Sequence, residues 1–114
     1  KTIAEARNRL SSADRPTAIF CYNDEIALIV LDVVREFGLK VPEDISIVGY
    51  DDSHLSEASE VKLTSVTHPK MQMGIEAAKW MIAKVEGRNT DKLEHSTVYK
   101  PELVVRHSTA KPKR

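Results

Sequence analysis

A chain of 114 residues is long enough to form about one small domain. Its 17 basic and 17 acidic residues balance, which argues against a bare nucleic-acid-binding surface, because such surfaces are usually strongly basic. An apolar fraction of 41% suits a globular α/β domain and excludes a disordered chain. Cys21 is the only cysteine, so no intrachain disulfide can form. The longest uncharged apolar run, residues 26–31, is too short to cross a bilayer.

The first half of the chain predicts a βαβ unit. In chain order, the predicted elements are a helix at residues 2–10, a strand at 17–22, a helix from about 24 to 37 and a strand at 45–50. Both strands are apolar runs of the kind that is covered on both faces of a sheet. Asn23 or Asp24 can cap the helix between them. The two strands should therefore be parallel and joined by a right-handed crossover. Because Lys1 stands inside an apparent helix, we interpret it as a truncated or processed start.

The second half continues with a polar loop and three further elements. The predicted order is a loop at 51–60, a strand at 62–67, a helix at 70–86 and an extended segment at 96–107. Pro69 can occupy the start of the helix, and Pro101 interrupts the extended segment. That segment should therefore lie at a sheet edge or consist of two short pieces. Residues 109–114 are expected to form a flexible tail.

Two pairs of polar residues follow the first two predicted strands. Asn23-Asp24 and Asp51-Asp52 each stand at the carboxyl end of a parallel strand, where ligands bind in open α/β sheets. Amide and carboxylate groups on a rigid scaffold can accept hydrogen bonds from the hydroxyls of a neutral sugar. A purely structural interpretation of each pair is also open. The first pair can simply cap a helix, and the second can simply stabilise a turn.

The same residues give weak support to other chemistry. Two neighbouring aspartates could bind a metal ion. No third ligand stands at a recognised spacing, however, and the histidines are scattered at 54, 68, 95 and 107. Asp51-Asp52 could also serve a hydrolase or a phosphate-accepting domain, although the accompanying lysine and threonine motifs are not evident. Cys21 lies inside a predicted covered strand, and no serine-centred elbow or glycine-rich phosphate loop occurs. We therefore expect no enzyme activity, no metal and no cofactor.

Two predicted helices carry apolar residues at positions that packing against a single core does not explain. In the helix from about 24 to 37, Leu28 falls within the polar arc and Ile29 lies at its edge. Either these are scattered surface residues, or the helix faces its sheet on one side and a partner subunit on the other. In the helix at 70–86 the apolar residues share one stripe: Met71, Ile75, Ala78, Met81, Ile82 and Val85. This stripe is too costly to leave in water, so we expect it to find a partner, for example by exchange between chains.

Three sequence blocks, RPTAIFCYNDEIAL, VPEDISIVGYDDS and LTSVTHP, resemble the lactose/galactose repressor family in order and spacing. The resemblance covers about residues 1–107. The wording CYNDEIAL with SEVKLTSVTHPK looks most like the arabinose-responsive repressors of Bacillus-type bacteria. It implies a truncated, parallel-sheet, Rossmann-like lobe of the periplasmic-binding-protein-like (type I) fold. Residues 1–108 would be the C-terminal part of the effector-binding and dimerisation domain, mostly second lobe, with 70–86 as a crossover helix that packs in the first lobe.

The resemblance also implies roles for particular residues. Asn23, Asp51 and His68 would contact the sugar, with Asp24 and Asp52 as support, although lactose-type members tend to have glutamine where His68 stands. The dimer interface would include Leu28 and Ile29 together with residues of the loop after GYDD, namely Leu55, Ala58 and Ser59.

The expected function is that of a cytoplasmic, sugar-responsive transcriptional repressor that forms homodimers. Its effector would be L-arabinose or a similar sugar, and it would reach operator DNA only through an N-terminal headpiece outside this sequence. No membrane partner is expected. The rival is a periplasmic sugar-binding protein of a transport system, which has the same fold. The upstream sequence would discriminate between them, by a DNA-binding segment or by a signal peptide.

Overall fold

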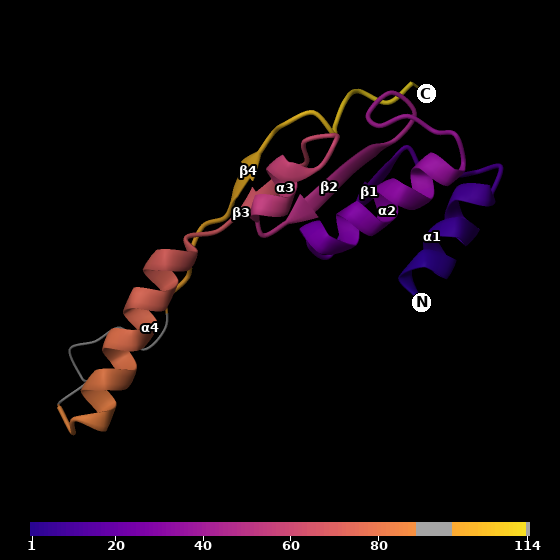
Figure 1. Cartoon of the computed structure of the whole chain (residues 1–114). Coiled ribbons are helices and arrows are strands. Elements are labelled where there is room, and N and C mark those ends of the chain that lie inside the picture. Colours follow the sequence, from indigo (N-terminus) through magenta and orange to yellow (C-terminus); the bar gives the residue numbers. More distant parts are fainter. Residues whose placement is uncertain (89–96, 114) are drawn as a thin grey trace. The chain divides into compact units, whose positions relative to one another are not determined.

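The computed structural model describes residues 1–88 and 97–113. The chain divides into two compact units, one of residues 1–67 with the segment from 102 onward and one that begins at His68 and ends at Pro101. The elements are α1 (Thr2–Ser11), β1 (Ala18–Phe20), α2 (Asp24–Glu36), β2 (Ser46–Tyr50), α3 (His54–Ala58), β3 (Thr64–Thr67), α4 (Lys70–Val85) and β4 (Glu102–Val104) (Figure 1). The predicted α/β class is confirmed.

The first unit is built on one sheet with the strand order β1-β2-β3-β4. β1 pairs with β2 and β2 with β3 in parallel, whereas β4 pairs with β3 in the antiparallel direction. Ile19 lies opposite Ile47, and Gly49 lies opposite Ser65. The predicted βαβ unit is therefore confirmed, and the carboxyl ends of β1, β2 and β3 lie at one edge of the sheet.

The core of this unit lies between α2 and the sheet. Asn23 caps α2, because its Oδ1 accepts a hydrogen bond of 2.9 Å from the backbone N–H of Ile26. Gly38, at φ +69°, follows the end of the helix in the left-handed conformation that glycine adopts without cost. The buried apolar side chains of this core include Leu10, Ala27, Val30, Leu31, Val34 and Ile47. Figure 1 shows α2 lying along the sheet with α1 beside it.

β1 departs from its predicted environment. The strand covers only Ala18–Phe20 of the predicted 17–22, and Phe20 and Tyr22 are 68% and 86% exposed. Ile19 and Cys21 instead turn toward the core beneath α2. The prediction of a strand covered on both faces was wrong for β1, because it is an edge strand whose neighbouring helices cover only the face of Ile19 and Cys21. The more central β2 fits the prediction better, with Ser46, Ile47 and Gly49 buried.

The chain after Pro101 returns to the first unit. β4 spans Glu102–Val104, the described regular part of the predicted 96–107 segment, of which residue 96 lies outside the described residues. Ser108 is fully buried and joins two strands, because its Oγ donates to the carbonyl of Ile47 at 2.5 Å and accepts from the N–H of Thr64 at 2.8 Å. This bridge attaches the C-terminal segment to the amino-terminal ends of β2 and β3.

The predicted tail, residues 109–114, makes contacts in its described part. The hydroxyls of Thr109 and Thr64 are 2.8 Å apart, and the N–H of Ala110 donates to Ser46 Oγ at 3.0 Å. The Lys113 ammonium lies 2.7 Å from a carboxylate oxygen of Asp44. The described part of the tail therefore contacts the first unit beyond residue 108. The flexibility of the tail stays a prediction.

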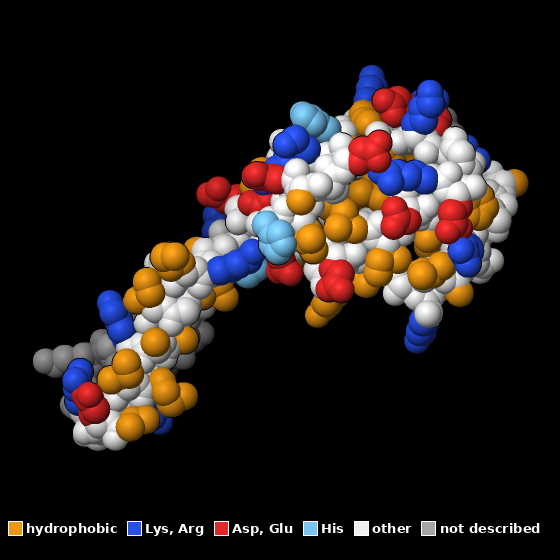
Figure 2. Space-filling view, viewed as in Figure 1, with side chains coloured by type: hydrophobic (Ala, Val, Ile, Leu, Met, Phe, Trp, Pro, Cys, Tyr) orange, Lys and Arg blue, Asp and Glu red, His pale blue; other side chains and the backbone are white. Residues whose placement is uncertain are grey.

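The second unit contains α4, which matches the helix predicted at 70–86. Lys84 Nζ lies 4.8 Å from the centre of the Trp80 ring, and the hydroxyl of Tyr99 donates to Glu76. The predicted apolar stripe is exposed: Met71, Ile75, Met81, Ile82 and Val85 are between 49% and 80% accessible (Figure 2). None of the described helices is both long and apolar enough to cross a membrane.

Candidate functional site

Asn23 and Asp51 emerge from neighbouring parallel strands, at their carboxyl ends, and both are half-buried. Asn23 is the third residue after β1 and caps α2 through its Oδ1. Because the Oδ1 atom already accepts the capping hydrogen bond, the amide NH₂ group is the part of this side chain best able to donate a hydrogen bond to a ligand. The helix-cap reading of Asn23 is therefore correct, and it is compatible with a binding role.

Asp24 has a structural position. Its side chain is buried, with 1% of the residue exposed, and its carboxylate accepts hydrogen bonds from the Ser53 N–H at 2.7 Å, the Ser53 hydroxyl at 2.8 Å and the Ser65 hydroxyl at 2.6 Å. A Cβ at Gly49 would lie 2.2 Å from Asp24 Oδ1, so only glycine leaves room for this carboxylate. The support that Asp24 can give to a binding site is to fix the loop after β2.

Asp51 and Asp52 form a turn with unusual backbone angles. Their φ values are +97° and +46°, in the region that favours glycine, and such strained residues are often found at functional sites. The turn is held by hydrogen bonds of 2.9 Å from the Asp51 N–H to the Val66 carbonyl and of 3.0 Å from the Asp52 N–H to Ser65 Oγ. The Asp52 carboxylate also pairs with Arg106 at 2.6 Å. The two aspartates thus differ, because the Asp52 side chain is held by Arg106 within the protein while Asp51 lines an open hollow.

That hollow has a volume of about 420 Å³ and is lined by Phe20, Cys21, Tyr22, Tyr50 and Asp51. It lies at the carboxyl ends of β1 and β2 and combines aromatic rings with one carboxylate. Burial raises the pKa of the Cys21 thiol to about 11, so this thiol stays protonated and unreactive at neutral pH. A larger hollow of about 490 Å³ between α1, β1 and α2 shares Phe20, Cys21 and Tyr22 but includes neither Asn23 nor Asp51.

The aromatic residues of this site were not predicted. Phe20, Tyr22 and Tyr50 were expected to be apolar members of covered strands. The signal that could have found them is their alternation with Ile19 and Cys21, which places Phe20 and Tyr22 on the opposite face of the strand. Among the described residues, no three histidine, cysteine, aspartate or glutamate side chains gather as a metal site.

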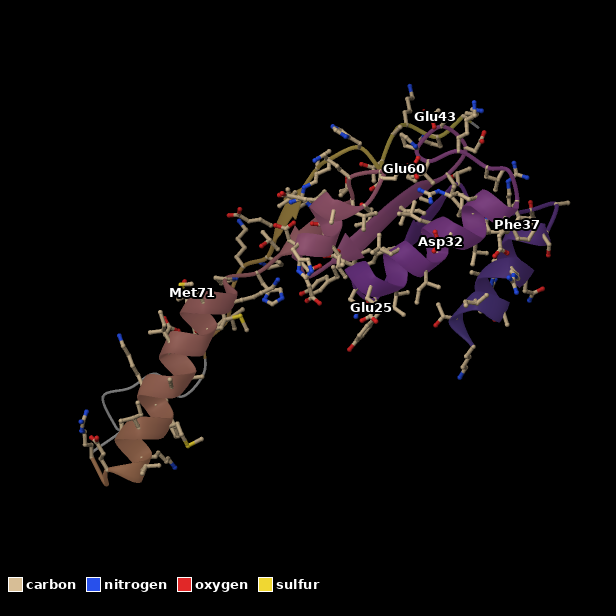
Figure 3. All side chains as sticks on the ribbon, viewed as in Figure 1. Glu25, Asp32, Phe37, Glu43, Glu60 and Met71 are labelled. Atoms are coloured by element: carbon tan, nitrogen blue, oxygen red, sulfur yellow. The ribbon has the colours of Figure 1, made fainter. Side chains whose placement is uncertain are left out.

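The remaining predicted residues lie in three places. His68 is half-buried and begins the unit of residues 68–101, so its contact with a ligand beside Asn23 and Asp51 stays a prediction. Leu28 is half-buried and packs against the core, and Ile29 is half-buried on the same helix. On or just after α3, Leu55 and Ser59 are half-buried and Ala58 is exposed. Their part in a dimer also stays a prediction. Glu25 and Asp32 mark the exposed side of α2 (Figure 3).

The profile of the periplasmic binding protein-like domain family matches residues 1–109. The chain belongs to this family. The periplasmic binding protein-like domain is 60% identical over 102 residues to the arabinose metabolism transcriptional repressor of Halalkalibacterium halodurans. That match covers 87% of this chain and 27% of the relative, so the chain spans about a quarter of the relative's length.

Two solved structures share the fold of the periplasmic binding protein-like domain. A LacI family transcriptional regulator from Bifidobacterium animalis subsp. lactis superposes with a TM-score of 0.81 at 32% identity, over 97% of this chain and 40% of the other. The complex of the transcriptional regulator CelR with cellobiose gives 0.82 at 36% identity, over 94% and 32%. The resemblance to the lactose/galactose repressor family and the periplasmic-binding-protein-like fold class are therefore confirmed.

Proposed function

We propose that this chain forms one wall of a sugar-binding cleft in a transcriptional repressor, with L-arabinose or a similar sugar as the effector. The observation that carries the proposal is the half-buried pair of Asn23 and Asp51 at the ends of adjacent parallel strands, beside an aromatic hollow. The likeness to an arabinose metabolism repressor at 60% identity supports both regulation rather than transport and the choice of sugar.

The chemistry of the site suits a neutral polyol. The Asp51 carboxylate can accept hydrogen bonds from sugar hydroxyls, and the Asn23 amide NH₂ can donate one while its oxygen stays with the helix cap. The rings of Phe20, Tyr22 and Tyr50 can cover the C–H face of a pyranose, which is apolar. His68 is proposed as a third polar contact.

Regulation would follow from a shift between two populations. Sugar bound between two lobes favours one orientation of the lobes, provided that its affinity differs between the orientations. A homodimer would transmit this change to DNA-binding headpieces outside the present sequence. The proposed dimer contacts are Leu28, Ile29, Leu55, Ala58 and Ser59. Such a repressor acts in the cytoplasm and needs no covalent chemistry.

The test is calorimetric titration of the protein in its full natural length with a panel of pentoses and hexoses. Asp51→Asn is the informative variant, because asparagine tolerates a positive φ but replaces one carboxylate oxygen with a donor. Losing a charge-assisted hydrogen bond of about 1.5–3 kcal/mol should weaken arabinose binding by roughly ten-fold or more. Asp32→Asn, on the exposed side of α2, is the matched control and should bind as the wild type does. An Asp51→Asn affinity equal to that of the wild type would exclude this site.

A further inference from the structure

Arg106 lies two residues beyond β4, and its side chain is only 13% exposed. A guanidinium with so little access to water needs several acceptors, because an arginine side chain carries five N–H donors and no acceptor. Its own backbone N–H donates to the Thr64 hydroxyl at 3.0 Å, which fixes the chain at the point where the side chain leaves it.

The guanidinium connects three segments of the first unit. Its Nη2 lies 2.6 Å from Asp52 Oδ1, in the turn after β2. Its Nη1 donates to Ser56 Oγ at 2.9 Å, in α3, and to the Leu63 carbonyl at 2.8 Å, before β3. A weaker contact of 3.4 Å joins Nη2 to Glu57, also in α3. One side chain thus holds the turn, the short helix and the start of β3 together.

The turn that Arg106 holds is the one that orients Asp51. Asp52 has a positive φ of +46°. Its backbone N–H donates a hydrogen bond to Ser65 Oγ, and its carboxylate pairs with Arg106. Asp51 precedes it with a φ of +97°. Residues in such conformations persist only where their surroundings over-determine them. Releasing the Asp52 carboxylate would therefore let the turn relax and change the direction of the Asp51 side chain.

We propose that Arg106 is a positioning residue for the effector, which keeps the Asp51-Asp52 turn in its binding conformation and ties that turn to α3. The proposal rests on the proposed function of Asp51. It adds a link between the sugar site and α3, because Ser56 and Glu57 belong to the same short helix as the proposed dimer residues Leu55 and Ala58. A planar guanidinium can reach acceptors in all three segments at once, whereas a lysine ammonium is a single point charge.

The experiment uses the protein in its full natural length and four variants, Arg106→Met, Arg106→Lys, Asp52→Asn and the double variant that combines Arg106→Met with Asp52→Asn. Arg35→Met is the control, since Arg35 is a half-exposed arginine that pairs with Glu60 and Asp32. One measurement is arabinose affinity by calorimetry, and the other is hydrogen exchange at the Asp52 amide, which is bonded to Ser65 Oγ. Arg106→Lys and Asp52→Asn serve as milder variants if Arg106→Met does not fold.

We expect Arg106→Met to weaken arabinose binding by about ten-fold and to speed exchange at the Asp52 amide, with Arg106→Lys between it and the wild type. Because the pair of Arg106 with Asp52 is the contact that holds the turn, the double variant should lose less affinity than the sum of the two single variants. The control should match the wild type in both measurements.

Three results would overturn the proposal. They are unchanged exchange at the Asp52 amide, faster exchange without any loss of sugar affinity, and fully additive losses in the double variant. If the wild type binds no sugar of the panel, the proposed function fails. The exchange measurement then still decides whether Arg106 holds the turn.

Discussion

Removal of the Asp24 carboxylate is the most direct test of how the sheet edge that carries the candidate site is held. Asp24→Ala eliminates the acceptor of three hydrogen bonds between 2.6 and 2.8 Å, which come from Ser53 and Ser65. The residue is 1% exposed, so water cannot simply replace the carboxylate without opening the structure. The variant therefore leaves buried donors unsatisfied and separates the start of α2 from the loop after β2.

The expected loss of stability follows from these contacts. A hydrogen bond to a charged group contributes about 1.5–3 kcal/mol, and each buried donor left without a partner costs about 1–3 kcal/mol. The terms overlap, and partial relaxation reduces the sum, so we expect the free energy of unfolding to fall by about 3–4 kcal/mol. The negative charge also lies in the first turn of α2, where the helix dipole adds a smaller stabilisation of about 0.3–1 kcal/mol.

Urea denaturation of the full-length protein, followed by circular dichroism, measures this change. Asp32→Ala is the matched control, because Asp32 lies on the same helix with a side chain 76% exposed and only a 3.6 Å pair with Arg35. It should stay within about 0.5 kcal/mol of the wild type. An Asp24→Ala protein that unfolds within about 1 kcal/mol of the control would refute the argument that this carboxylate holds the loop.

Three further outcomes follow from the same structure. Gly49→Ala should destabilise by about 1–3 kcal/mol, because its Cβ would lie 2.2 Å from Asp24 Oδ1, and equal urea midpoints for variant and wild type would contradict this. The Lys113 ammonium and the Lys40 N–H hold the pKa of the Asp44 carboxyl below its ordinary value, so the pair stabilises above the unfolded pKa and loses its effect as the pH falls through the lowered folded pKa. An NMR titration should show the Asp44 pKa rising in Lys113→Met, and no change would remove Lys113 as the cause. Burial raises the pKa of Cys21 to about 11, so an aromatic disulfide reagent at pH 8 should react slowly with the native protein and rapidly in urea. Rapid labelling of the native protein would show that the thiol is accessible.

The local patterns of the sequence determined the order of the elements and the place of the candidate site. Two apolar runs with a helix between them that Asn23 or Asp24 can cap were enough to predict β1 and β2 as parallel strands joined by α2. Since parallel strands align their carboxyl ends, the sequence alone assigns Asn23 and Asp51 to one edge of the sheet. These features depend on residues close together in the chain, so a single sequence contains them.

The tertiary structure alone decided which polar residue lines an open hollow and which is held by contacts within the protein. Asp24 and Asp52 each stand beside a proposed sugar contact in the sequence, but no local pattern gives their own partners. Asp24 is buried against Ser65, and Asp52 pairs with Arg106, which is 54 positions away. The exposure of Phe20 likewise follows from the packing of the helices against only the face of β1 that carries Ile19 and Cys21. Contacts of this kind form only when distant strands assemble, and no local pattern of hydrophobicity or capping records which partner will arrive.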